Sequence, residues 1–289
     1  MEDFKINYDG GEGVQGIWIP IRRLDEGIEY VKKNKIADVY IWADGSTEKH
    51  TIDFDFLEEM KFLKSFHFAA SLSKNSDITG IYSLENVKDF GWNATEKFPI
   101  DFANLSQLES LRIYHFPQMT NFESLQKLKK FSIQSIKAKD LTFIEKLNRL
   151  EKLSLLRGDL ISTEGLKKLE NLKEVELRYL SKLVNIEDLA LNPNVRKLSI
   201  EACKKLTDYS VLSKNEGIEF LSVFYSKIDS LKFVKEMKSI DYVSFSDLTD
   251  GDLMPLLQSK TLSEVRFYPQ KKHYSHSEEE INELLKKKS

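Results

Sequence analysis

The 289-residue sequence has very little cysteine and no surplus of positive charge. Cys203 is the only cysteine, so the chain cannot form an intrachain disulfide, which is typical of a reducing compartment. The 43 basic and 46 acidic residues give a net charge of −3, whereas dedicated nucleic-acid-binding proteins usually carry a basic excess. The charge balance therefore predicts a partner other than nucleic acid.

Long apolar segments are also absent. No apolar run approaches the roughly 20 residues that a membrane-spanning helix needs, which predicts that the chain makes no membrane contact. The N-terminal stretch, MEDFKINYDGGEG, lacks the basic start and apolar stretch of a secretory signal. We therefore expect a cytoplasmic protein, and the richness in Lys, Asn, Ile and Glu suggests a bacterial source.

What the sequence does contain is a repeat. Hydrophobic residues make up 41% of the chain, and many of them recur in a triplet spaced as L-x-x-L-x-L. The first members of the clearest copies are separated by roughly 22 residues, a period that indicates a solenoid. These copies are Leu108-Leu111-Ile113, Leu128-Phe131-Ile133, Leu150-Leu153-Leu155, Leu172-Val175-Leu177, Val195-Leu198-Ile200, Ile218-Leu221-Val223, Ile240-Val243-Phe245 and Leu262-Val265-Phe267.

Three weaker copies precede these and bring the number of expected strands to eleven. They are Ile36-Val39-Ile41, Leu63-Phe66-Phe68 and Val87-Phe90-Trp92. Alternate residues of a strand face opposite ways, so the last two members of each triplet are expected to point into the core. Apolar residues three or four apart after each strand predict short helical or 3₁₀ turns.

This pattern resembles the leucine-rich-repeat family, in its roughly 22-residue, internalin-like bacterial variety. The resemblance covers residues 36–269 and implies an α/β fold: a curved, horseshoe-shaped solenoid with a parallel sheet on its concave face and short helices or 3₁₀ turns on its convex face. One feature departs from the family, which usually places Asn or Cys three residues after the triplet. These positions hold Phe116, Ile136, Gly158, Leu180, Cys203, Ser226 and Leu248.

We predict three segments: an N-terminal cap over residues 1–35, about 11 repeats over 36–269, and a capping helix within 270–289. In the first segment, two strand-like stretches flank a glycine-rich turn at 10–13, and a helix follows over about 25–35 with Ile28 and Val31 on one side. In the last, Ser277 and Glu280 form a capping box that opens a helix over 278–287. Ile281, Leu284 and Leu285 are its expected apolar stripe.

The exposed positions of the sheet are the best indication of function. Five residues between the inner apolar pairs are serine, and large aromatics gather toward the C-terminal half. Tyr, Trp and Arg are enriched where protein interfaces concentrate their binding energy. The alternative is that the aromatics only cover the sheet and stack across neighbouring strands. The predicted partner-binding residues are Tyr114, Arg157, Arg178, Tyr179, Phe220, Phe224, Tyr225, Tyr242, Arg266 and Tyr268.

Several patterns suggest chemistry but are better explained by structure. Glu176 and Glu201, in adjacent repeats, are a carboxylate pair of the kind that hydrolyses glycosides, yet an open sheet encloses no substrate. His273 and His276 are fewer than the three or four ligands that zinc needs. The acidic turn of Asp247, Asp250 and Asp252 lacks the closing Glu of a calcium loop and is expected to cap the following helix. We therefore predict no catalytic residues, metal or cofactor.

The function predicted from the sequence is a non-catalytic scaffold that binds an unidentified partner protein on its concave face. An immunity or antitoxin-type inhibitor, which covers a toxin, is one alternative. A glycan binder, or a structural protein that self-associates through the aromatic patch, is another.

Overall fold

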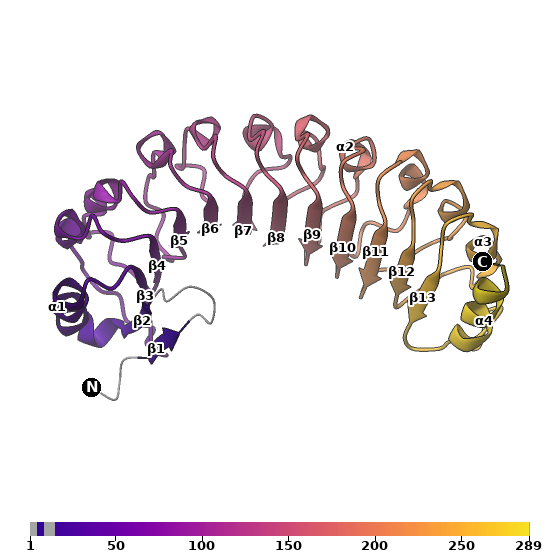
Figure 1. The fold of residues 1–289 in the computed structure, drawn as a ribbon, viewed down its shortest axis with the longest axis horizontal. Helices are drawn as coiled ribbons and strands as arrows, with labels where there is room; N and C mark the ends of the chain where they lie inside the picture. Colours follow the sequence, from indigo (N-terminus) through magenta and orange to yellow (C-terminus); the bar gives the residue numbers. More distant parts are fainter. Residues whose placement is uncertain (1–4, 9–14, 289) are drawn as a thin grey trace. The chain divides into compact units, whose positions relative to one another are not determined.

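The computed structural model describes residues 5–8 and 15–288, whose helices and strands are labelled in Figure 1. They form two compact units. Unit 1 is Met1–Ile133 and unit 2 is Gln134–Ser289. In both units, a short strand alternates with a return segment that leads to the next strand. The glycine-rich turn expected at 10–13 lies outside the described residues.

Unit 1 holds strands β1 to β6, hydrogen-bonded in the order of the sequence. All its described neighbours are parallel except β1 and β2, which pair antiparallel. The strands are β1 (Lys5–Tyr8), β2 (Gln15–Pro20), β3 (Asp38–Trp42), β4 (Ser65–Ala69), β5 (Asp89–Trp92) and β6 (Ser110–Tyr114). The helical segments are η1 (Ile21–Arg23), α1 (Leu24–Asn34), η2 (Phe54–Glu59), η3 (Thr79–Ser83), η4 (Phe102–Leu105) and η5 (Phe122–Ser124).

Unit 2 continues the same alternation, and strand β7 (Lys130–Ile136) spans the boundary between the units. Its strands β8 to β13 are all parallel to their neighbours. They are β8 (Lys152–Gly158), β9 (Glu174–Arg178), β10 (Lys197–Glu201), β11 (Phe220–Phe224), β12 (Tyr242–Phe245) and β13 (Glu264–Phe267). The helical segments are η6 (Thr142–Ile144), η7 (Leu166–Lys168), α2 (Glu187–Ala190), η8 (Ser210–Lys214), η9 (Val234–Glu236), α3 (Met254–Gln258) and α4 (Glu278–Lys288).

All eleven predicted strands are present, and the α/β solenoid with a parallel sheet is confirmed. The second strand-like stretch predicted near the N-terminus, Ile17 to Ile19, lies within β2. The structure adds that β2 pairs with β3 in the register of the repeats, Ile17 beside Val39 and Ile19 beside Ile41. The sequence contains the triplet of this strand, because Val14 precedes Ile17 and Ile19 with the same internal spacing as the other copies.

The core is built from the triplets in register. Leu198 of β10 lies between Val175 of β9 and Leu221 of β11, and all three are buried. Burying a side chain of this size stabilises the fold by about 1.5–3 kcal/mol. The loops add a ladder of backbone hydrogen bonds, since the amide at the start of each strand donates to the equivalent carbonyl one repeat earlier. Examples are Lys173 to Glu151, Arg196 to Lys173 and Glu219 to Arg196, each at 2.9 Å.

At several repeats the usual asparagine position of the family holds an apolar side chain, and Ile136, Leu180 and Leu248 are all buried. Two buried asparagines occur elsewhere, three residues before the triplets that begin at Val195 and Ile218. Most other repeats have leucine at this position. These two triplets are the ones preceded by the longest steps between the clear copies, so the asparagines stand where the return segment is one residue longer.

The buried asparagines bond the backbone of their own and the preceding repeat. Asn192 Nδ2 donates to the carbonyls of Leu166 and Leu169 at 2.9 and 3.0 Å. Asn215 Nδ2 donates to the carbonyl of Asn192 at 2.9 Å, while its Oδ1 accepts from two amides of the following turn at 2.7 and 2.8 Å. Each side chain therefore satisfies backbone groups that the longer segment would otherwise bury unpaired.

The C-terminal helix α4 closes the open edge of β13. Asn282 Oδ1 accepts from the amide of Val265 at 2.9 Å, and its Nδ2 donates to the carbonyl of the same residue at 2.8 Å. Glu278 accepts from the amide of Phe267 at 2.7 Å. These side chains replace the missing next strand, so the edge is not free to pair with another chain.

The predicted capping box is confirmed. The amide of Ser277 donates to Glu280 at 2.7 Å, and the amide of Glu280 donates to the Ser277 hydroxyl at 3.1 Å. The predicted stripe holds for Ile281 and Leu285, which are buried, but not for Leu284, which is 38% exposed because it lies beside the edge of the buried face.

The predicted N-terminal helix is α1, with Ile28 and Val31 buried as expected. It ends at Lys35, whose left-handed φ of 53° stops the helix before β3. None of the helices in the described part of the chain is both long and apolar enough to cross a membrane.

Replacing Asn215 with alanine should lower the free energy of unfolding by about 2–4 kcal/mol, because several buried backbone groups lose their partners. Equilibrium urea denaturation followed by circular dichroism measures the loss. Asn171→Ala is the matched control, since this exposed side chain donates to the carbonyl of Asn148, also one repeat back, at 2.6 Å. We expect it to cost less than about 1 kcal/mol. Equal losses would contradict a special role for the buried amide.

Candidate functional site

Nine of the ten predicted partner-binding residues belong to unit 2. The tenth, Tyr114, is half-buried at the end of β6 in unit 1, and the site is described without it. Phe220 and Tyr242 begin their strands, and Arg266 lies within β13. The other six lie at one edge of the sheet, at or near the carboxyl ends of the parallel strands, because successive repeats hold them at equivalent positions: Arg157, Arg178, Tyr179, Phe224, Tyr225 and Tyr268.

The turn that follows each strand at this edge has an unusual backbone. The residue two positions after the last triplet member has a left-handed φ of 51–61° in five successive repeats: Ser135, Arg157, Tyr179, Ala202 and Tyr225. This conformation turns each amide toward the next repeat. The amide of Tyr179 donates to the carbonyl of Glu201 at 2.8 Å, and that of Tyr225 donates to the Ser246 hydroxyl at 2.8 Å. Residues other than glycine and asparagine rarely adopt this backbone conformation, because it costs them about 1–2 kcal/mol.

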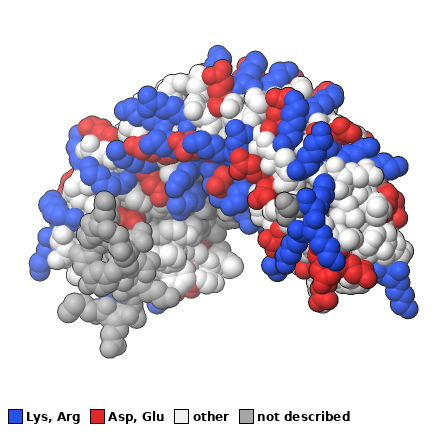
Figure 2. All heavy atoms as spheres, turned by 45° about the vertical axis from the view of Figure 1, so that its right-hand side comes forward, with Lys and Arg blue, Asp and Glu red and all other residues white. Residues whose placement is uncertain are grey.

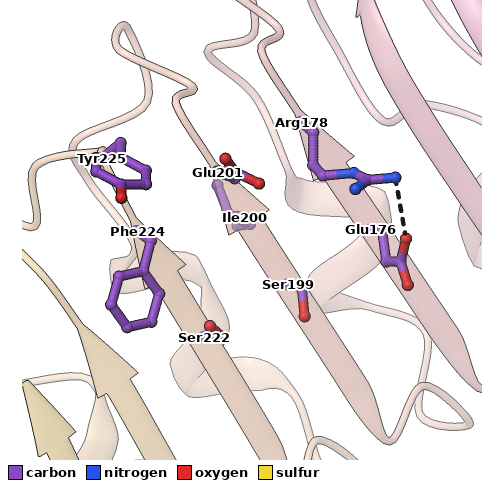
Figure 3. A pocket seen from close by; sticks show the side chains of 8 residues that line it. All are labelled: Glu176, Arg178, Ser199, Ile200, Glu201, Ser222, Phe224 and Tyr225. Carbon is purple, nitrogen blue, oxygen red and sulfur yellow. Dashed lines mark ion pairs between the residues drawn. The ribbon is translucent and has the colours of Figure 1, made fainter.

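Three tyrosines at this edge are strongly exposed. Tyr179 is 45% exposed, Tyr225 71% and Tyr268 80%. Phe224 is half-buried beside Tyr225, at the end of β11 (Figure 3). The Arg157 guanidinium lies 5.8 Å from the Tyr179 ring, whereas Tyr225 and Tyr268 leave a large aromatic area facing solvent.

Other members of the predicted set are explained by local packing. Phe220 and Tyr242 are neighbours in β11 and β12, and their rings stack at 4.6 Å with planes 3° apart. Lys197 Nζ lies 5.5 Å from the Phe220 ring. Arg266 pairs with Glu264 of its own strand at 2.7 Å. For Phe220 and Tyr242, cross-strand stacking accounts for much of the aromatic surface.

A first depression, of about 420 Å³, lies over β9 to β11 (Figure 3). Its lining is Glu176, Arg178, Ser199, Ile200, Glu201, Ser222, Phe224 and Tyr225. Short serine side chains make its floor, whereas the aromatic rings of β11 and the charged side chains of β9 and β10 stand around it. It is open to solvent and encloses nothing.

The carboxylates of this depression are engaged by neighbouring side chains. Lys152 and Ser154 contact Glu176 at 3.0 Å each, and Arg178 lies 3.6 Å from it. Burial acts to raise the pKa of Glu176, but the hydrogen bond from Lys152 and the other contacts outweigh it and hold the pKa below its ordinary value. Glu201 accepts from the Tyr179 hydroxyl at 2.9 Å, which raises the pKa of that hydroxyl. A general acid of a glycosidase needs a raised carboxyl pKa, so Glu176 does not fit that role.

A second depression, of about 990 Å³, lies on the other side of Phe224 and Tyr225. Its remaining aromatic wall is Tyr268, which is followed by Pro269. Three lysines and one aspartate line it as well: Lys204, Lys227, Lys271 and Asp247. The two depressions therefore share one aromatic wall and differ in charge. The first is lined by two carboxylates and one guanidinium, and the second by three ammonium groups and one carboxylate.

The lysines of the second depression were not predicted from the sequence, although they occupy a fixed position in the repeat. Each stands four residues after the last member of its triplet: Lys204 after Ile200, Lys227 after Val223 and Lys271 after Phe267. The predicted partner-binding residues all lie within two positions of the inner apolar pair, whereas these lysines stand further on, in the turn.

A second group of polar and aromatic side chains, also missed, lies on the sheet of unit 1. Trp18, Tyr40 and His67 stack in successive strands, with ring centroids 4.5 and 5.7 Å apart. His67 and Arg112 both contact one oxygen of Asp89, at 3.2 and 3.1 Å. These contacts pair the side chains with one another within unit 1.

The remaining candidate patterns have structural roles. His273 contacts the carbonyl of Leu248 at 3.0 Å, and His276 contacts the Ser275 hydroxyl at 3.0 Å. Asp252 accepts from the amide of Met254 at 3.0 Å, so it caps α3 as expected. Burial raises the pKa of the Cys203 thiol to about 11. Within residues 5–8 and 15–288, no group of three His, Cys, Asp or Glu side chains is arranged to hold a metal ion.

Comparison with known proteins identifies the fold. No protein-family model and no curated protein sequence matches the chain. Among solved structures, InlJ of Listeria monocytogenes matches 81% of this chain and 60% of its own at 13% identity and a TM-score of 0.50. A TLR13–ssRNA13 complex matches 87% of this chain and 47% of its own at 13% identity and a TM-score of 0.52. Internalin C2 of Listeria monocytogenes matches 73% and 83% at 19% identity, with a TM-score of 0.49.

These likenesses and the repeat spacing define the class: the chain has the leucine-rich-repeat fold, with repeats of the internalin-like length. The resemblance inferred from the triplets is confirmed. At these identities the likeness extends to the fold alone, so the function must be argued from this chain's own surface.

The strained turn at Tyr225 makes a testable prediction. Because its φ is 51°, Tyr225→Gly should be more stable than Tyr225→Ala by about 1 kcal/mol. At Tyr242, within β12, the order should reverse, since glycine weakens a strand by roughly 0.5–1 kcal/mol relative to alanine. Urea denaturation of the four variants checks both. An alanine variant at 225 at least as stable as the glycine variant would show that the turn is not strained.

Proposed function

We propose that this chain is a non-catalytic scaffold that binds a partner protein on the exposed face of the unit 2 sheet, at the edge where its strands end. The observation that carries the proposal is the exposure of Tyr225 and Tyr268 on either side of a depression, with Phe224 at its wall. Tyrosine provides a large contact area with few rotatable bonds, which suits a binding surface.

The backbone supports a role for these side chains beyond folding. Tyr179 and Tyr225 occupy left-handed positions where glycine or asparagine is favoured, and Tyr225 gains little burial there, since it is 71% exposed. The repeat uses this turn conformation at Ser135 and Ala202 as well, so the turn does not require an aromatic ring, and backbone strain is concentrated at functional sites. A tyrosine kept in such a position is consistent with selection for its exposed ring.

A catalytic role has less support. The two carboxylates of the first depression are already bonded, Glu176 to Lys152, Ser154 and Arg178, and Glu201 to Tyr179. The depression is open, whereas the electrostatic part of catalysis depends on excluding water. These contacts favour binding over glycoside hydrolysis.

A nucleic-acid partner also has less support. The TLR13 structure is a complex with ssRNA13, so the fold accommodates such a ligand. A polyanion needs a continuous basic track, however, and in this chain Lys and Arg are mixed with Asp and Glu over the face in view in Figure 2. Glu176 and Glu201 stand next to the exposed tyrosines. The mixed charge favours a protein as the partner. We propose that the interaction takes place in the cytoplasm.

Site-specific photo-crosslinking in the native cell tests the proposal. A photoreactive phenylalanine analogue replaces Tyr225 in one variant and Leu191 in a control, a residue that is 45% exposed beside α2. We expect a discrete adduct with one other protein from position 225 and none of the same mass from position 191. Tyr225→Ala and Tyr268→Ala should each weaken binding of that partner about tenfold or more, measured by titration calorimetry.

The adduct's identity decides between the alternatives. A toxin as the captured protein would establish the inhibitor role, and a crosslink between two copies of this chain would establish self-association. An adduct that also forms from position 191, or an affinity unchanged by both alanine substitutions, would contradict a binding surface at the tyrosines.

A further inference from the structure

We propose that the second depression, between Tyr225 and Tyr268, takes an acidic segment of the partner protein that carries an aromatic or aliphatic anchor. This inference rests on the proposed function and adds the chemistry of the partner. The inference is based on an aromatic wall and a set of lysines that line the second depression together, at the ends of β11 to β13.

The depression has an excess of positive charge. Of its three lysines, Lys271 forms an ion pair with Asp247, the one acidic residue of the lining. For the ammonium groups of Lys204 and Lys227, no ion pair or hydrogen bond is found within the described residues. Both are free to bind carboxylates of a partner, and charge complementarity of this kind selects partners and speeds association.

The rest of the lining is suited to an apolar side chain. Phe224, Tyr225, Tyr268 and Pro269 form a wall on which a ring or an aliphatic chain can pack. The volume of about 990 Å³ lies at the upper end of the roughly 300–1,000 Å³ found for ligand sites, so a short segment of chain fits rather than a single ion. An apolar anchor flanked by carboxylates matches both parts of the lining.

The first depression places carboxylates on the other side of the shared aromatic wall. It shares Phe224 and Tyr225 with the second but contributes Glu176 and Glu201. Glu176 is compensated by Lys152 and Arg178, whereas within the described residues the Tyr179 hydroxyl is the only side-chain partner of the Glu201 carboxylate. A segment that crosses the shared wall therefore meets lysines on one side and Glu201 on the other. A polypeptide whose acidic part precedes or follows a basic residue suits this order, and a uniformly charged nucleic acid does not.

Selection of random peptides tests the inference without the natural partner. A phage-displayed heptapeptide library is selected on the full chain, and the selected peptides are synthesised and titrated by fluorescence anisotropy. We expect Asp and Glu to be enriched beside Phe, Tyr or Leu. Lys204→Glu/Lys227→Glu should weaken these peptides about tenfold or more, with affinity falling as salt rises.

The matched control is Lys173→Glu/Lys232→Glu, which makes the same change of net charge at exposed lysines outside both depressions. It should change affinity less than about twofold. Selected peptides without acidic enrichment, no selected peptides, or equal weakening by the two double variants would each overturn the inference. A decauridylate that binds with the same dependence on Lys204 and Lys227, while acidic peptides do not, would overturn it in favour of nucleic acid.

Failure of the inference is distinguishable from failure of the proposed function. If photo-crosslinking at position 225 captures a partner whose affinity depends on Tyr225 but not on Lys204 or Lys227, the binding surface stands and its acidic specificity fails. If the selected peptides bind Tyr225→Ala/Tyr268→Ala as tightly as wild type, the tyrosines are not the site and both fail.

Discussion

The structure depends on one constraint. Each repeat must bury its apolar side chains against the next repeat and must also hydrogen-bond its polar backbone groups to it, and both sets of contacts must recur with the same period. The sheet register meets the first part, with Val175, Leu198 and Leu221 side by side. The loop ladder meets the second, with amides such as Arg196 donating one repeat back. Because both ladders advance by one repeat, a change of repeat length must be compensated locally, within the segment that contains it.

The two longest steps between the clear triplets show how that compensation works. The extra residue would leave backbone groups of the return segment buried without partners, and Asn192 and Asn215 supply them with a side-chain amide. The same solution appears at the C-terminal edge, where Asn282 of α4 both donates to and accepts from the backbone of Val265. In each place an amide side chain replaces backbone hydrogen bonds that regular stacking cannot provide, since it carries both a donor and an acceptor.

The repeat period of the sequence predicts which side chains are buried, and it predicts little about the exposed ones. Burial recurs once in every repeat, so the triplets locate the strands, and Val14, Ile17 and Ile19 have the same spacing at β2. The residue types at exposed positions do not recur from repeat to repeat. The sequence therefore shows where the tyrosines stand in the repeat, but it does not show which side chains they pack against. Phe220 and Tyr242 looked equivalent to Tyr225, yet they stack on each other because the register places them side by side. The left-handed turns could not be predicted from the sequence, because tyrosine and arginine are not residue types that favour a positive φ.

The same constraint explains why the candidate site lies where the strands end. Within a strand, a side chain on the exposed face still has neighbours on both sides, and Glu176 is held by Lys152 and Ser154. Past the strand end, the left-handed turn directs the amide of Tyr225 to Ser246, while the side chain of Tyr225 is 71% exposed. Lys204 and Lys227 stand two residues further on in their turns and are equally unengaged within the described part of the chain. The turns are thus where this scaffold can change residue types without disturbing either ladder, which is what a surface specific for one partner requires.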